Sequence, residues 1–215
     1  VVVVHPASAT EESISNNYKN ISFTGAKKEA INMASVKEYN LKNNFRVTTA
    51  NSKTDKVTIL LTMTNNDIKP QNPAASLVLG EILSEGSMLR NQEAFDLDLA
   101  KNGIGLSSGS EYNSITSSVV CNSDDLTKAL EAMKENIENP RFTQEEFEHA
   151  KNNIKEEFLK LDKSAYDKLD AELYKGLPDG YSKDDVLKGL ENLTIDDVKA
   201  FYNSIAQNSI GQVVV

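Results

Sequence analysis

The sequence predicts an α+β fold, in which a sheet of about five to six strands is covered by helices. Short β-favouring runs occur on both sides of the helical segments. The helical segments repeat apolar residues with a period near 3.6 and begin at capping signals, and a last β-favouring run closes the chain. With 215 residues, 39% of them hydrophobic and 26% charged, the chain is long enough to bury a sizeable core.

The first 35 residues do not share the pattern of the rest. Val1 to Val4 are typical of a buried strand, and Pro6 cannot continue a ladder, so the strand should end there. Residues 7–35 are polar and have no sustained period, which indicates a linker. The chain also lacks a starting methionine, so we expect residues 1–35 to be the end of a preceding domain and a linker, and residues 36–215 to form one domain.

Residues 36–41, 45–50 and 57–63 are three short β-favouring runs. Asn43-Asn44 separates the first two runs, and the polar residues 51–56 separate the second from the third. This order predicts that the three strands pair in sequence as a meander.

Two helices should follow. Asn72 is a candidate N-cap before Pro73, which is favoured at a first helical position. The first helix should end near Gly86 and be buried on most sides, because it carries Leu77, Val78, Leu79, Ile82 and Leu83. The second should cover about 91–101, with Gly103 as its C-terminal cap.

Residues 104–108 and 114–121 are the next predicted strands. In the second, Ile115, Ser117, Val119 and Cys121 alternate with polar or small residues, as in a half-buried strand.

The C-terminal part contains helices with N-terminal capping signals. Ser123 is a candidate N-cap for a helix that ends at Pro140 and places these residues on one face: Leu126, Ala129, Leu130, Met133 and Ile137. Thr143 and Glu146 form a capping-box pattern for a helix that buries Phe147, Ala150, Ile154, Phe158 and Leu161.

Pro178, Asp179 and Gly180 then predict a turn. Thr194 and Asp197 repeat the capping-box pattern for a last helix that carries Val198, Phe201, Tyr202 and Ile205. Residues 210–215 close the chain as a strand.

The composition excludes several classes of function. With 32 acidic and 23 basic residues the net charge is −9, and no basic patch is present, so we expect no nucleic-acid partner. No apolar run approaches the length of a membrane span, so none is expected. The single cysteine, Cys121, cannot form an internal disulfide, which leaves cytoplasmic and periplasmic locations both open.

The residue types that carry chemistry are sparse. His5 and His149 lie 144 positions apart, so no helical histidine pair can bind zinc, and both are interpreted as surface residues. Cys121 should be a small core residue and not a nucleophile. The glycines 103, 105 and 109 are better explained by a turn and close packing than by a nucleotide loop.

Two groups of carboxylates, Glu145, Glu146 and Glu148 in one and Glu156 with Glu157 in the other, occur in the fourth of these helices. Acids in the first turn and on the solvent face of a helix explain them better than acid–base catalysis does. Catalysis by these clusters remains the less favoured alternative.

The order of several short motifs resembles the pitrilysin/insulinase-like zinc metallopeptidases, over about residues 36–215. The motifs are Leu-x-Asn-x-φ-Arg-Val (φ apolar) at 41–47, Gly86-Ser87, Leu89-Arg90, Leu99-x-x-x-Gly103, Asn139-Pro140-x-Phe142, and Leu193-Thr194-x-x-Asp197-Val198-x-x-Phe201-Tyr202. The resemblance implies a mixed, largely antiparallel sheet with helices packed on it.

Active domains of this family carry an inverted zinc motif, His-x-x-Glu-His, on the helix that ends at the Gly-Ser or Gly-Thr pair. Alignment on Gly86-Ser87 places its histidines at Leu77 and Glu81 and its catalytic glutamate at Gly80. The third-ligand position falls on Glu157, 76 residues after Glu81. The resemblance therefore implies a degenerate site, with no catalytic residue and no zinc cofactor in this chain.

Non-catalytic domains of the family pair with an active half, in the same polypeptide or as a separate subunit, so that both enclose a peptide. The resemblance thus implies an active, zinc-containing partner half and a peptide substrate, while no substrate-binding residue is assigned here. A non-proteolytic scaffold or interaction subunit with the same fold, as in respiratory complexes, is the alternative. An intact His-x-x-Glu-His in a neighbouring segment or gene would favour the peptidase.

Overall fold

The computed structural model describes residues 36–42, 44–51, 54–68, 72–160, 169, 173 and 181–215. They belong to one compact unit, Ala34–Val215. The strand expected at 1–4, the linker at 7–35 and the turn around Pro178 lie outside the described residues. The domain boundary expected at residue 35 stays a prediction.

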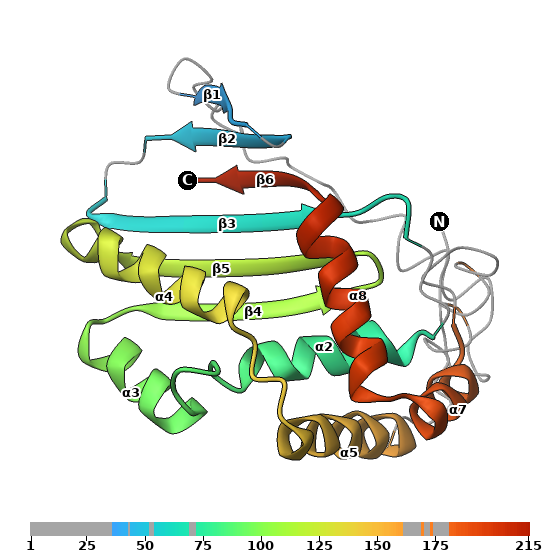
Figure 1. Cartoon of the computed structure of the whole chain (residues 1–215). Helices are drawn as coiled ribbons and strands as arrows, with labels where there is room; N and C mark the ends of the chain where they lie inside the picture. The colour runs from blue at the N-terminus through green and yellow to red at the C-terminus, as the bar shows by residue number, and fades with distance from the viewer. Residues whose placement is uncertain are drawn as a thin grey trace, which may run out of the picture. The chain divides into compact units, whose positions relative to one another are not determined.

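The described strands form one six-stranded sheet in the order β1-β2-β6-β3-β5-β4 (Figure 1). The strands are β1 (Val36–Asn40), β2 (Phe45–Ala50), β3 (Lys56–Thr64), β4 (Gly105–Glu111), β5 (Ser114–Asn122) and β6 (Ile210–Val214). Only the β2–β6 pair among them is parallel. The expected mixed, largely antiparallel sheet is confirmed.

The predicted meander is wrong at its third strand. β1 and β2 form an antiparallel hairpin through Asn44, whose φ is 60°, but β3 pairs with β6 and β5 and not with β2. β6 takes the place between β2 and β3, and the ring of Phe45 occupies the space into which a side chain at Gly211 would project. Such long-range pairing leaves no signal in the residues around 51–56.

Helices cover one face of this sheet, and Figure 1 shows α4 and α8 lying across it. The described helices are α2 (Ala74–Ser84), α3 (Gln92–Lys101), η2 (Ser123–Asp125), α4 (Leu126–Glu138), α5 (Gln144–Lys160), α7 (Lys183–Asn192) and α8 (Ile195–Asn208). On the opposite face no described side chain of β3 or β5 is fully buried. Examples are Thr58 and Leu60 of β3 and their partners Val120 and Ser118 of β5.

Three predicted helix ends are confirmed. At α2 the Asn72 side chain accepts a hydrogen bond from the Ala74 amide (3.0 Å) as expected, although the helix begins at Ala74, one residue after the predicted Pro73. Gly103 ends α3 with a φ of 61°, a conformation that favours glycine. Thr194 and Asp197 form the complete capping box at the start of α8.

Other caps differ from the prediction. Ser123 does not cap α4, because the chain leaves β5 through the short helix η2 and enters α4 without a side-chain cap. The Thr143 hydroxyl accepts from the Glu146 amide (3.2 Å), but the Glu146 carboxylate turns to Arg141 Nε (2.6 Å), so this box is only half formed.

Helix α7 was not predicted, although the sequence contains the signals for it. Ser182 and Asp185 form a complete capping box, and Val186 and Leu190 lie one helical turn apart and are buried.

The apolar interior consists of two clusters. The larger joins α2, α5, α7 and α8 to the sheet, and Val78, Leu79 and Ile82 of α2 are fully buried in it. The smaller lies between α3, α4 and β5 and includes Cys121. Leu130, expected on the buried face of α4, is 44% exposed, so the buried stripe of that helix is narrower than predicted.

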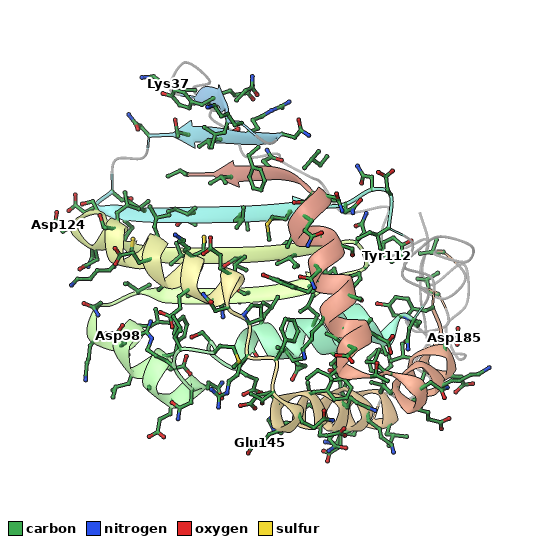
Figure 2. All side chains as sticks on the ribbon, viewed as in Figure 1. Lys37, Asp98, Tyr112, Asp124, Glu145 and Asp185 are labelled. Atoms are coloured by element: carbon green, nitrogen blue, oxygen red, sulfur yellow. The ribbon has the colours of Figure 1, made fainter. Side chains whose placement is uncertain are left out.

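The turn after α2 is held by a charged group on α4. The Glu135 carboxylate accepts hydrogen bonds from Arg90 Nε (2.9 Å), Arg90 Nη2 (2.7 Å) and the Ser87 hydroxyl (2.6 Å). Arg90 Nη1 also pairs with Asp98 of α3, labelled in Figure 2 (2.6 Å). Hydrogen bonds from Arg90 and Ser87 hold the pKa of the Glu135 carboxyl below its ordinary value, against the opposing effect of burial.

Asn136, the neighbour of Glu135, supports the same turn from the interior. Its buried side-chain amide donates to the carbonyl oxygens of Leu83 (2.8 Å) and Gly86 (3.0 Å) at the end of α2. These two carbonyls therefore keep a hydrogen-bond partner although the helix ends in the core.

Leu79→Ala should lower the free energy of unfolding by about 2 to 5 kcal/mol, because a fully buried leucine leaves a cavity when it is truncated. Leu97→Ala on α3, where the side chain is 53% exposed, is the matched control and should change it by about 0.5 kcal/mol or less. Urea unfolding measures both. Equal losses in the two variants would contradict the burial of α2.

Glu135→Gln should lower the free energy of unfolding by about 1.5 to 3 kcal/mol at neutral pH, because it removes a charged hydrogen-bond acceptor from Arg90. The folded-state pKa of Glu135 is lowered, so its contribution is complete above the unfolded-state pKa and is lost as pH falls through the folded-state value. The difference in stability between parent and variant should therefore shrink on acidification. Denaturant titrations across the acid range test this, with Glu138→Gln, a 60% exposed neighbour, as the control.

Candidate functional site at the contact of α2 and α5

The four positions aligned with the family's catalytic residues lie on two helices that pack together. Leu77, Gly80 and Glu81 lie on α2, and Glu157 lies on α5. Asn153 Nδ2, one turn before Glu157 on α5, donates a hydrogen bond to Glu81 Oε2 (3.2 Å). The fold therefore directs Glu81 towards the face of α5 that also carries Glu157.

The residues at these positions either pack against the core or face solvent. Leu77 is half-buried and packs against the larger apolar cluster. A Cβ atom at Gly80 would lie 3.3 Å from the Ser110 amide nitrogen of β4, so α2 approaches the sheet closely at this point. Glu81 is half-buried and Glu157 is exposed.

These residues do not fit the zinc ion that the fold family implies. Leu77 has no donor atom and Gly80 has no side chain, which leaves two carboxylates where the motif supplies two imidazoles, one glutamate base and a third ligand. Among the described residues, neither Glu81 nor Glu157 belongs to a group of three potential ligands. We derive no catalytic step through a metal at this position.

The other residues singled out in the sequence do not form a catalytic group either. Cys121 is fully buried, and burial raises the pKa of its thiol, which disfavours the nucleophilic thiolate. Gly105 and Gly109 lie within β4, so they do not form a phosphate-binding loop.

Several glutamates in the two carboxylate clusters on α5 make local contacts within the helix or next to it. Glu145, labelled in Figure 2, is exposed in the first turn of α5. Glu148 accepts a hydrogen bond from Gln144 (2.9 Å), and Glu156 pairs with Lys160 (3.2 Å). Glu146 accepts from Arg141 Nε and also lies near Glu85, the C-cap residue of α2.

The contact of α2 with α5 also brings together residues that the sequence did not connect. His149 Nδ1 lies 3.0 Å from Glu85 Oε1, although the two residues are 64 positions apart. With Glu146 they form a group whose potential ligand atoms all lie within 4.8 Å of one another. His149 was expected to be a plain surface residue; its side chain is 56% exposed but is paired with the 11% exposed side chain of Glu85.

A separate hollow of about 350 Å³ lies beside the strands β2, β3 and β6. It is lined by Asn44, Arg46, Thr62, Thr64, Ile210, Gly211 and Gln212. These residues include no carboxylate, thiol or imidazole, so the hollow offers hydrogen-bond donors and one positive charge but no group for metal binding or general base catalysis.

No helix among the described residues has both the length and the apolar character that a membrane span requires.

The fold resembles several solved structures. A peptidase M16 inactive domain from Pseudomonas fluorescens superposes with a TM-score of 0.70 at 20% identity, over 83% of this chain and 46% of that one. A protease from Helicobacter pylori gives 0.69 at 18% identity, over 83% and 45%, and a conserved protein from Enterococcus faecalis gives 0.71 at 16%, over 84% and 48%. The chain thus spans about half of the length of each of these structures.

No curated protein matches the chain in sequence. Residues 46–182, however, match the model of the insulinase family, peptidase family M16. This match covers more than half of the 215 residues and agrees with the superposed folds. The chain therefore belongs to the insulinase family of peptidases, M16.

Proposed function

We propose that this chain is a non-catalytic domain of a zinc-dependent M16 metalloendopeptidase and forms part of a chamber that encloses peptide substrates together with an active half. The observation that carries the proposal is the residue content of the aligned site. Leu77, Gly80 and Glu81 stand where an active domain has its two histidines and its catalytic glutamate.

The chemistry of the family requires that site to be intact. A bound zinc ion polarises the scissile carbonyl and supplies an activated water, and the glutamate between the histidines acts as the base. This chain has two histidines, 144 positions apart, so it contains no His-x-x-Glu-His sequence at any position. The zinc ion would then be held by the partner half alone.

Two findings support the proposal, one for the pairing with another half and one for the lack of catalysis. The solved structures that share the fold contain about as much chain again as the part that this chain covers. One of them is a peptidase M16 inactive domain, which supports the non-catalytic assignment proposed here.

Such a domain would contribute by confining the peptide substrate. A wall opposite the active half holds an extended peptide near the metal and limits the access of bulk water. The net charge of −9 would favour basic over acidic peptides through a long-range electrostatic interaction that weakens with salt.

The isolated chain should not hydrolyse unfolded peptides, the metal-bearing half alone should hydrolyse them slowly, and the two together should be fully active. Assays of the three samples on the same peptides test this, with a chelator as the control for zinc dependence. Chelator-sensitive cleavage by the isolated chain would refute the non-catalytic assignment. Full activity of the other half alone would favour a scaffold role.

Glu81→Gln and Glu157→Gln should not change the amount of zinc that the isolated chain retains. These two carboxylates lack the histidine partners of the family site. Metal analysis after dialysis gives the zinc content of the parent and the two variants. A stoichiometric zinc ion that is lost in either variant would mean that the aligned positions still form a metal site.

A further inference from the structure

We propose that Glu85, Glu146 and His149 bind a divalent transition-metal cation of the zinc class, at the C-terminal end of α2 and the first turns of α5. This site differs from the degenerate family position, because it uses neither Leu77 and Glu81 nor Glu157. The inference does not depend on the proposed function.

The donor atoms already lie close to the spacing that a metal ion requires. Two ligands of a tetrahedral zinc ion, each at about 2.0 to 2.1 Å from the metal, are separated by roughly 3.3 Å. His149 Nδ1 and Glu85 Oε1 lie 3.0 Å apart, and all three donors lie within 4.8 Å. Side-chain rotations that shorten the longer separations would complete the set.

The charge on Glu85 gives a second and independent reason for a cation at this place. Glu85 is only 8% exposed and stands at the C-cap of α2, where the helix dipole disfavours a negative charge. The last turn of α2 contains no basic residue. Among the described residues the carboxylate has one partner, the His149 ring, and its Oε2 has none. A buried carboxylate in this setting is stabilised by a bound cation.

Glu146 is held in a position suited to a ligand. Its side chain is 16% exposed, and Arg141 Nε donates to its Oε1 at 2.6 Å, while its Oε2 has no partner in the described part of the chain. An outer hydrogen bond of this kind orients a ligating carboxylate and leaves the second oxygen for the metal.

The donor set selects the class of metal. Two carboxylates with one imidazole suit Zn²⁺ and related transition metals, whereas Ca²⁺ and Mg²⁺ prefer oxygen ligands only. Three protein ligands leave a fourth position for water, which the exposed side of His149 allows. The metal would link the end of α2 to the start of α5, which are otherwise joined here by the contact of Glu85 with His149.

The experiment titrates the 215-residue chain with Zn²⁺ in a calorimeter and with Co²⁺ followed by visible absorption, with Mg²⁺ and Ca²⁺ in parallel. We expect one Zn²⁺ per chain, an absorption spectrum of low-coordinate Co²⁺, and weaker binding of Mg²⁺ and Ca²⁺. His149→Ala and Glu146→Gln should each weaken Zn²⁺ binding by about tenfold or more. Glu148→Gln, on the same helix but outside the group, should bind as the parent does.

Thermal unfolding provides the second readout. Zn²⁺ should raise the Tm of the parent and of Glu148→Gln but not that of His149→Ala, because a ligand stabilises only a fold that binds it. The exposed position of His149 lets this variant fold, which circular dichroism verifies. The proposal is overturned if the parent binds no Zn²⁺, or if His149→Ala and Glu146→Gln bind it as tightly as the parent.

Discussion

The pairing of β6 between β2 and β3 is the interaction on which the arrangement of this domain depends. In the described sheet, β6 connects the hairpin of β1 and β2 to the remaining strands. The Val215 amide donates to the Thr48 carbonyl oxygen (2.8 Å), and the Ala50 amide donates to the Val215 carbonyl oxygen (2.8 Å). Because α8 leads directly into β6, the same pairing also fixes where α8 crosses the sheet. The last described strand and the hairpin of β1 and β2 are thus held together through β2.

Helix α2 shows how the same framework changes its role. The alignment on Gly86-Ser87 puts two of the family's three metal-ligand positions on this helix, but here Val78, Leu79 and Ile82 are fully buried and Gly80 lies close to β4. The helix therefore stabilises the core through apolar contacts. Polar groups also meet where α2 contacts α5: Glu81 with Asn153 and, one turn further along α2, Glu85 with His149.

Local signals explain which elements could be predicted. The cap at Thr194 depends on Asp197, three positions away, so it is visible in sequence. Ser123 fails as a cap because β5 continues to Asn122 and the chain then passes through η2, which depends on the pairing of β5 with β3. The alternation in β5 predicted its buried face correctly, since strand periodicity is also a local property.

The sequence by itself determined the α+β class, most helix and strand positions, and the lack of a His-x-x-Glu-His motif, because each follows from residue types within one short segment. Only the tertiary structure decided the place of β6 in the sheet and the meeting of His149 with Glu85, 64 positions away. Neither leaves a local pattern, because strand order and helix packing are set by the burial of apolar surface over the whole domain. The group of Glu85, Glu146 and His149 is therefore a property of the fold and not of any segment of the sequence.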